Sequence, residues 1–143
     1  MIEPAKRREI YGFMKPCRHG VISTVSQNGA PEAAFISLAT MPDLSVIFET
    51  INTTRKYGNL CREPRVALVI GWGGDKTLQY EGSADEPDGS ELDAIKSAYY
   101  AGLPENNSHE SWPGLTYIRV RPRWIRLSNY GSPWMVEEFN FED

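Results

Sequence analysis

The residues best suited to chemistry lie close together, between Phe48 and Arg65. Small hydroxyl and amide side chains come first, followed by the adjacent cations Arg55 and Lys56 at the start of a helical pattern that Pro64 ends. A helix N-terminus offers unpaired backbone N–H groups and the positive end of a dipole. Threonine hydroxyls and two cationic heads add donors that fit phosphate oxygens. This stretch predicts an anion site, and an N-capped surface helix with solvated charges is the alternative.

Other kinds of catalytic or metal site have little support in the sequence. It contains no Ser/His/Asp or Cys/His signature of a nucleophile, and no His, Cys or carboxylate cluster has metal-ligand spacing. His19 begins an expected strand, and His109 lies in a polar stretch where we expect it to be solvated. No catalytic residue is identified and no metal is expected. A bound cofactor is the expected source of any redox chemistry.

Composition limits the class of protein. The chain has 143 residues, and we expect a single domain over residues 1–143 with a real core. A net charge of −4 argues against nucleic acid as a partner. Cys17 and Cys61 form no scaffold, so we expect a reduced, cytoplasmic setting without a disulfide, and Cys61 on the core side of its helix. No signal peptide or apolar run of transmembrane length is found, so no membrane partner is expected.

Hydrophobic periodicity predicts the elements that position the basic stretch. Helices are expected over residues 3–14, 54–63 and 91–100. Strands are expected over residues 19–26, 32–38, 45–50, 65–72, 77–84, 115–121 and 123–128, with the last two separated by a break at Pro122. Residues 101–114 are typical of a long loop. Short strands joined by hairpins or a helical excursion predict a mainly β fold with flanking helices, arranged as a closed antiparallel barrel.

The strand expected over residues 65–72 differs from the others because its centre is apolar throughout. Residues 66–70 read Val-Ala-Leu-Val-Ile, whereas the strand over residues 77–84 alternates polar and apolar side chains. Such a run is expected where both faces of a strand are covered. We therefore expect one face of this strand to pack on the core and the other on a partner.

The stretch around Arg55 and Lys56 resembles the pyridoxamine 5′-phosphate oxidase-like, FMN-binding split-barrel family. The matching pattern joins a strand end, a small-residue turn, a basic pair and an apolar strand, at Phe48, Thr50, Thr54, Arg55, Lys56, Leu60 and residues 64–69. The resemblance spans residues 16–129 and is densest over residues 50–70. It implies a split barrel of six or seven strands that forms a homodimer, with two flavin sites across the interface.

The resemblance also implies a set of cofactor-binding residues. They are Glu49, Thr50, Thr54, Arg55, Lys56, Thr77 and Gln79. The threonines and the basic pair near the helix start would hold the phosphate and ribityl chain of FMN, and Glu49 would contribute backbone contacts. Thr77 or Gln79 would reach the flavin ring. Trp72 and Trp112 are candidate aromatic walls.

Two departures from the family pattern narrow the expected function. Ala34 and Ala39 stand where the vitamin-oxidising enzymes carry an Arg and a Lys, although the backbone of residues 34–38 would still flank the flavin ring. The C-terminal arginine–histidine substrate motif has no match near residues 128–135. The resemblance therefore implies an FMN-dependent oxidoreductase with an unassigned small-molecule substrate, not a true pyridoxamine phosphate oxidase. A non-enzymatic flavin- or haem-binding module on the same fold is the alternative, and a deazaflavin is a further candidate cofactor.

Overall fold

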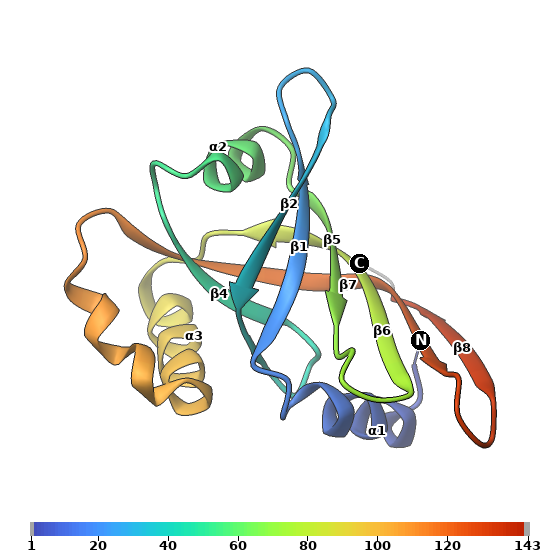
Figure 1. Cartoon of the computed structure of the whole chain (residues 1–143). Coiled ribbons are helices and arrows are strands. Elements are labelled where there is room, and N and C mark those ends of the chain that lie inside the picture. Colours follow the sequence, from blue (N-terminus) through green and yellow to red (C-terminus); the bar gives the residue numbers. More distant parts are fainter. Residues whose placement is uncertain (1, 142–143) are drawn as a thin grey trace.

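The computed structural model describes residues 2–141 as a curled antiparallel sheet with flanking helices (Figure 1), which confirms the predicted mainly β class. Met1, Glu142 and Asp143, at the ends of the expected single domain, lie outside the described residues. The strands are β1 (His19–Val25), β2 (Pro31–Ser37), β3 (Ala39–Thr40), β4 (Val46–Ile51), β5 (Arg65–Ile70), β6 (Lys76–Asp85), β7 (Leu115–Asn129) and β8 (Met135–Asn140). The helices are α1 (Pro4–Met14), α2 (Arg55–Arg62), α3 (Gly89–Gly102) and the 3-10 helix η1 (Pro104–Ser111).

The strands follow the order β2-β1-β5-β6-β7-β4-β3, and β8 pairs with β7 outside this path. The two ends of the path are successive parts of the chain, because only Leu38 separates β2 from β3. The sheet therefore curls back on itself into a half-barrel, as expected for a split barrel. The described strands include no ladder that joins β2 to β3 or to β4, so the expected closure of the barrel is not observed.

Alternation along β5 separates a buried face from an outward face. Val66, Leu68 and Ile70 are buried in the main core. Ala67 is exposed, and Val69 on the same outward face is 40% exposed. Both faces of this strand were expected to be covered. Within a single chain the core covers one face, and the other face is exposed.

β7 is one continuous strand, so the predicted break at Pro122 is wrong. Pro122 pairs with Gly82 and Trp124 pairs with Glu81, which leaves Arg123 as an extra residue in a β-bulge opposite β6. A bulge interrupts the ladder locally and tolerates a residue that has no N–H donor. The strand can therefore pass through the proline and continue to Asn129.

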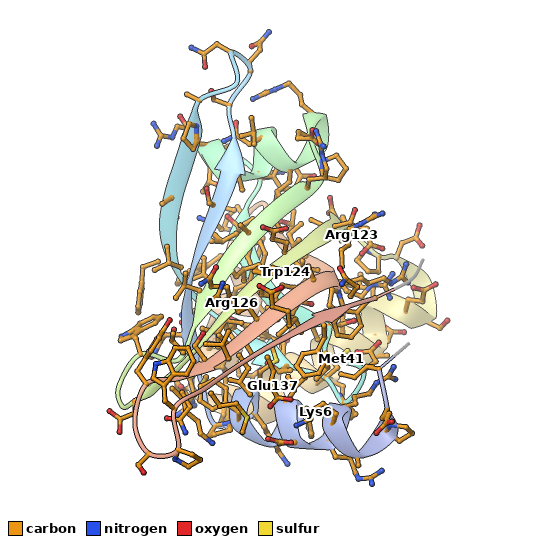
Figure 2. The ribbon with its side chains drawn as sticks, turned by 90° about the vertical axis from the view of Figure 1, so that its right-hand side faces the viewer. Lys6, Met41, Arg123, Trp124, Arg126 and Glu137 are labelled. Atoms are coloured by element: carbon orange, nitrogen blue, oxygen red, sulfur yellow. The ribbon has the colours of Figure 1, made fainter. Side chains whose placement is uncertain are left out.

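Three elements were not predicted from the sequence, namely the two-residue strand β3, the strand β8 and the 3-10 helix η1. β8 lies in the tail after Asn129 and pairs along the second half of β7. Lys6 of α1 lies 3.1 Å from a carboxylate oxygen of Glu137 in β8, and Figure 2 shows these two side chains pointing toward one another. η1 occupies most of the segment expected to be a loop.

The helices cover different parts of the sheet. Figure 1 shows α1 at one end of the half-barrel and α2 at the other. α3 forms a second apolar cluster with β3, β4 and β7, in which Ile95 and Tyr99 pack near Ile47 and Tyr117.

Within residues 2–141, no helix has the length and apolar character required to cross a lipid bilayer.

Both cysteines are free, and one lies on a different face than expected. Asn59 and Leu60 are the buried residues of α2, whereas Cys61 is exposed. The predicted position of Cys61 on the core side of its helix is therefore wrong. In a helix of only eight residues, the face set by Asn59 and Leu60 leaves the following residue outside the contact with the sheet.

Gly82→Ala is expected to lower the free energy of unfolding by about 1–3 kcal/mol, as overpacking of a tight site does. A Cβ at this position lies 2.4 Å from the carbonyl oxygen of Arg121 and 2.7 Å from Val120 Cγ1, so the bulge must shift. Urea unfolding followed by circular dichroism measures the change. Gly73→Ala is the matched control, because its Cβ meets nothing within 4 Å, and its effect should stay within about 0.5 kcal/mol. Equal midpoints for the two variants would contradict the prediction.

Candidate functional site

A pocket of about 250 Å³ opens beside the turn between β4 and α2. Its lining combines hydroxyls, a cation, a carboxylate, a histidine and an aromatic ring, which belong to Thr50, Thr54, Lys56, Glu49, His109 and Trp112. Four of the seven residues that the resemblance implied, Glu49, Thr50, Thr54 and Lys56, therefore meet in one place. Trp112 lines the pocket, as expected for an aromatic wall, whereas Trp72 lies elsewhere.

Thr54 fixes the start of α2. Its backbone is extended, and its Oγ1 accepts a hydrogen bond from the N–H of Tyr57 at 3.4 Å. The same hydroxyl donates to the carbonyl oxygen of Ile51 at 3.0 Å. Thr50 Oγ1 lies 2.8 Å from Thr54 Oγ1 and is the donor in that pair, because a hydroxyl has one proton. Both protons are thus used within the turn, so the threonines shape the site and do not offer free donors.

The free donors at the start of α2 are backbone N–H groups and Lys56. Among the described residues, the N–H groups of Arg55 and Lys56 make no hydrogen bond, as is usual in the first turn of a helix. Lys56 lines the pocket and forms no ion pair within residues 2–141. Burial lowers the pKa of Lys56, the direction expected for a cation without a partner. These groups together can bind an anion.

Arg55, the other half of the basic pair, does not line the pocket. Its side chain is 74% exposed, and its Nε lies 3.1 Å from Oε1 of Glu32. Glu32 also accepts a bond of 2.7 Å from the buried amide of Asn59, which donates at 3.0 Å to Thr24 as well. This network attaches α2 to β1 and β2, so Arg55 serves the attachment while Lys56 faces the pocket.

Glu49 and His109 form the polar wall contributed by β4 and η1. The Glu49 side chain is only 9% exposed, and its Oε1 is bonded to Nδ1 of His109. The His109 ring stacks on Trp112, with ring centroids 3.8 Å apart and planes inclined by 19°. The second carboxylate oxygen, Oε2, is buried and makes no hydrogen bond within the described chain. The expectation that His109 is merely solvated is therefore wrong.

Tyrosines surround the buried carboxylate. The hydroxyl oxygens of Tyr100 and Tyr117 are 2.5 Å apart, and Tyr99 accepts a bond of 3.1 Å from the amide of Asn106. Burial is the main cause that raises the pKa of Tyr99 and of Tyr117, and the charge of Glu49 adds to both shifts. The tyrosines therefore stay neutral near pH 7, and they contribute no charge to this wall.

Thr77 and Gln79 do not line the pocket. They lie on β6 on either side of the buried Leu78, and so face outward. Gln79 pairs in register with Val69 on the outward face of β5. Within one chain, these two residues are separated from the pocket that contains Lys56, and their implied contact with the cofactor stays a prediction.

His109, Tyr99 and Asn106 were not identified as site residues from the sequence. They reach the pocket because α3 packs on β4 and carries η1 with it, and no local spacing signals that approach. The polar composition around His109 suggested a solvated loop instead.

Within residues 2–141, no group of three or more His, Cys, Asp or Glu side chains is placed to hold a metal ion.

A larger hollow of about 840 Å³ lies between α1, β3 and α3. Its lining is mostly apolar and includes Leu38, Met41 and the cation Arg18. Arg18 is already bonded to both carboxylate oxygens of Glu105, at 2.5 and 2.6 Å. We assign the functional site to the smaller pocket, because a free cation and free N–H groups converge there.

Comparison with known proteins agrees with the pattern around the basic pair. The family model described as pyridoxamine 5′-phosphate oxidase matches residues 7–129. A pyridoxine/pyridoxamine 5′-phosphate oxidase of Serratia proteamaculans is 24% identical over 110 residues, which cover 76% of this chain and 49% of that protein. The chain spans about half the length, or less, of the curated relatives that it matches.

Solved structures share the fold at low sequence identity. A heme binding protein from Mycobacterium smegmatis has a TM-score of 0.79 at 16% identity, over 98% of this chain and 59% of that one. A pyridoxamine 5′-phosphate oxidase-related, FMN binding protein from Nostoc punctiforme has a TM-score of 0.64 at 13% identity, over 97% and 94% of the two chains. These likenesses establish the fold, and they leave the ligand of this chain to be argued from its own residues.

Thr54→Val is expected to lower the free energy of unfolding by about 1 kcal/mol, the usual cost of losing a helix N-cap. The change keeps the shape of the side chain but removes the hydroxyl that joins Thr50, Ile51 and Tyr57. Thr54→Ser retains the hydroxyl and is the matched control, with an expected effect within about 0.5 kcal/mol. Denaturant unfolding of the ligand-free protein measures both. A Val variant as stable as the Ser variant would show that this hydroxyl does not determine the turn.

Proposed function

This chain belongs to the pyridoxamine 5′-phosphate oxidase family, and from that premise we propose that its pocket binds FMN for the oxidation or reduction of a small molecule. The observation that carries the proposal is the free cation of Lys56, which lines a pocket at the start of α2 beside two unpaired backbone N–H groups. A phosphate group is the ligand chemistry that such a helix start binds best.

The rest of the lining fits the flavin ring. Phe35 and Trp112 line the same pocket, yet 65% and 48% of their surfaces are exposed. Large exposed aromatic side chains around a pocket favour a flat ligand that covers them. A bound flavin supplies hydride and electron transfer, so the chain itself needs to bind, orient and shield the cofactor. Flavin binding is therefore compatible with a chain in which no catalytic residue is identified.

The proposed substrate is a small molecule other than a vitamin phosphate. Ala34 and Ala39 provide no cation on β2 or β3, and Ala39 is buried in the cluster under α3. Turnover of NADH or NADPH by the flavin-loaded protein would separate an oxidoreductase from a flavin-binding module.

Haem is the second candidate ligand because of the way His109 is held. The bond from Nδ1 to Glu49 leaves Nε2 as the nitrogen available to iron, and carboxylates commonly orient metal-ligating histidines in this way. The structural neighbour from Mycobacterium smegmatis is described as a heme binding protein. The absorbance spectrum of the purified protein decides between the candidates. Flavin absorption bands would support FMN, and a Soret band would support haem. A deazaflavin would bind the same phosphate site and would be recognised by its own absorption spectrum.

The proposed assembly is a homodimer that covers the outward face of β5. Ala67 and Val69 are exposed there, and the outward residues Thr77 and Gln79 lie beside them on β6. Apposition of two such faces would remove apolar area from water and bring Thr77 and Gln79 to the cofactor of the second copy. Stable interfaces of this kind bury on the order of 2,000 Å² or more.

Light scattering at micromolar concentration is expected to give the mass of a dimer for the wild-type chain. Val69→Asp should shift the protein toward monomer, because it places a buried charge in the apolar interface of both copies. Circular dichroism should show the fold of this variant unchanged, since residue 69 lies outside the core of one chain. A wild-type monomer would contradict both the dimer and a site shared between subunits.

Lys56→Ala is expected to weaken FMN binding by roughly 10- to 150-fold, the value of one charge-assisted hydrogen bond. Riboflavin lacks the phosphate, so its affinity should barely change. Fluorescence-quenching titrations of both flavins measure the difference. Arg55→Ala is the matched control, because Arg55 is paired with Glu32 outside the pocket and should affect FMN much less. Equal losses of FMN and riboflavin in Lys56→Ala would place the phosphate elsewhere.

A further inference from the structure

The 3-10 helix η1 forms one wall of the pocket without an apolar anchor of its own. Asn106 and His109 of this helix line the pocket, and Trp112 follows at its end. Yet none of the residues of Pro104–Ser111 is buried. A segment with few buried apolar contacts opens locally at a lower free energy than the core does. We therefore expect the wall formed by η1 to open more readily than the rest of the domain.

Contacts between polar side chains hold η1 in place. Three pairs of ionisable side chains join it to the segment before β1, to α3 and to β4, and these pairs are Arg18–Glu105, Lys96–Glu110 and Glu49–His109. Nη2 of Arg18 lies 2.5 and 2.6 Å from the two carboxylate oxygens of Glu105, and the two side chains are 46% and 56% exposed. Exposed ion pairs contribute little stability and are screened by salt. The contact between Arg18 and Glu105 therefore holds η1 only weakly.

Both ends of the η1 segment are fixed. Leu103, before η1, is 1% exposed, and its N–H donates to the carbonyl oxygen of Tyr99 at 2.9 Å. After η1, the carbonyl oxygen of Gly114 accepts a bond of 2.8 Å from the N–H of Asn52, and Gly114 has a φ of 77°, which glycine adopts easily. Figure 1 shows η1, in orange, beside α3 and outside the half-barrel. The segment between Leu103 and Gly114 can therefore move as a unit between two fixed points.

The pocket is small for the proposed cofactor. Its volume of about 250 Å³ lies below the roughly 300–1,000 Å³ of pockets that enclose drug-sized ligands, the size class of a flavin. The strand walls of the pocket cannot move apart easily, because β4 pairs with β7 and β2 pairs with β1 along their full lengths. η1 belongs to no such ladder. Displacement of η1 is therefore the simplest way to make room for a flavin.

We propose that η1 is a gate of the flavin pocket and that the structure shows it closed. The flavin enters as η1 moves away from β4, and the ion pair between Arg18 and Glu105 opposes this movement. The inference rests on the proposed flavin function and concerns how access to the same site is regulated. Neither Arg18 nor Glu105 lines the pocket, so a substitution of either residue removes no contact to the ligand.

The gate predicts that loss of this surface ion pair tightens flavin binding. The apparent Kd of a ligand is inversely proportional to the fraction of protein in the binding-competent state. An exposed ion pair shifts such an equilibrium by roughly 1.5- to 5-fold. Glu105→Gln and Arg18→Gln should therefore each lower the Kd of FMN and of riboflavin by that factor. The double variant should gain no more than either single variant, because the pair is already absent.

Fluorescence-quenching titrations of both flavins measure these affinities, and two controls isolate the gate. Glu63→Gln removes the exposed pair of Glu63 with Arg65, which lies outside the pocket, and should leave both affinities unchanged. Arg18→Gln and Glu105→Gln change the net charge in opposite directions, so a purely electrostatic effect on the FMN phosphate would have opposite signs in the two variants. Hydrogen exchange of residues 104–111 should become faster in both variants, and circular dichroism checks that each is folded.

The outcomes separate the gate from the proposed function. Tighter binding of both flavins in both single variants, with faster exchange in η1, supports the gate. Weaker or unchanged binding in these variants, or changes of opposite sign, would overturn the gate and leave flavin binding in place. Failure of the wild-type protein to bind either flavin would overturn both the gate and the proposed function.

Discussion

The hydroxyl of Thr54 is the interaction on which the candidate site depends. It caps α2 through the N–H of Tyr57, donates to Ile51 in the strand before it, and accepts from Thr50. A strand and a helix are thereby joined through a single side chain, and the helix start faces the pocket. The same strand end is fixed from outside, because Thr116 of β7 donates to the carbonyl oxygen of Thr50 at 2.6 Å. The unpaired N–H groups and Lys56 take their positions from this junction.

β7 connects that junction to the rest of the molecule. It pairs with β4 along its first half and with β8 along its second half, and β6 follows it on both sides of the bulge. The bulge at Arg123 lets one long strand serve both halves, because an extra residue increases local twist and bends the strand. The buried hydroxyl of Tyr80 lies 2.7 Å from the carbonyl oxygen of Leu44 and 3.0 Å from that of Val120 in β7. Tyr80 of β6 therefore links the turn before β4 to β7.

The pocket keeps a cation and a carboxylate apart. Lys56 comes from the helix start and has no ion-pair partner in the described chain, whereas Glu49 is bonded to His109 on η1. Had Lys56 and Glu49 been paired, each would have satisfied the other and left little for a ligand. Because they are separate, the ammonium group of Lys56 is left for an anion at the start of α2.

Local sequence patterns determined the elements around the phosphate-binding turn, whereas tertiary packing decided which side chains meet there. The basic pair, the cap at Thr54 and the stop at Pro64 are short-range signals, so the helix and its family resemblance were recognisable from the sequence. The break expected at Pro122 was wrong because a long-range register with β6 accommodates the proline in a bulge. His109 is 60 residues from Glu49 in the chain and reaches it only because α3 packs on β4 and directs η1 to the pocket. Lys56 lines the pocket and Arg55 does not, and this difference also depends on tertiary structure. Glu32 of β2 forms an ion pair with Arg55 outside the pocket. Periodicity reports which face of an element is apolar, but the identity of a buried polar partner depends on contacts between distant segments, which no local pattern encodes.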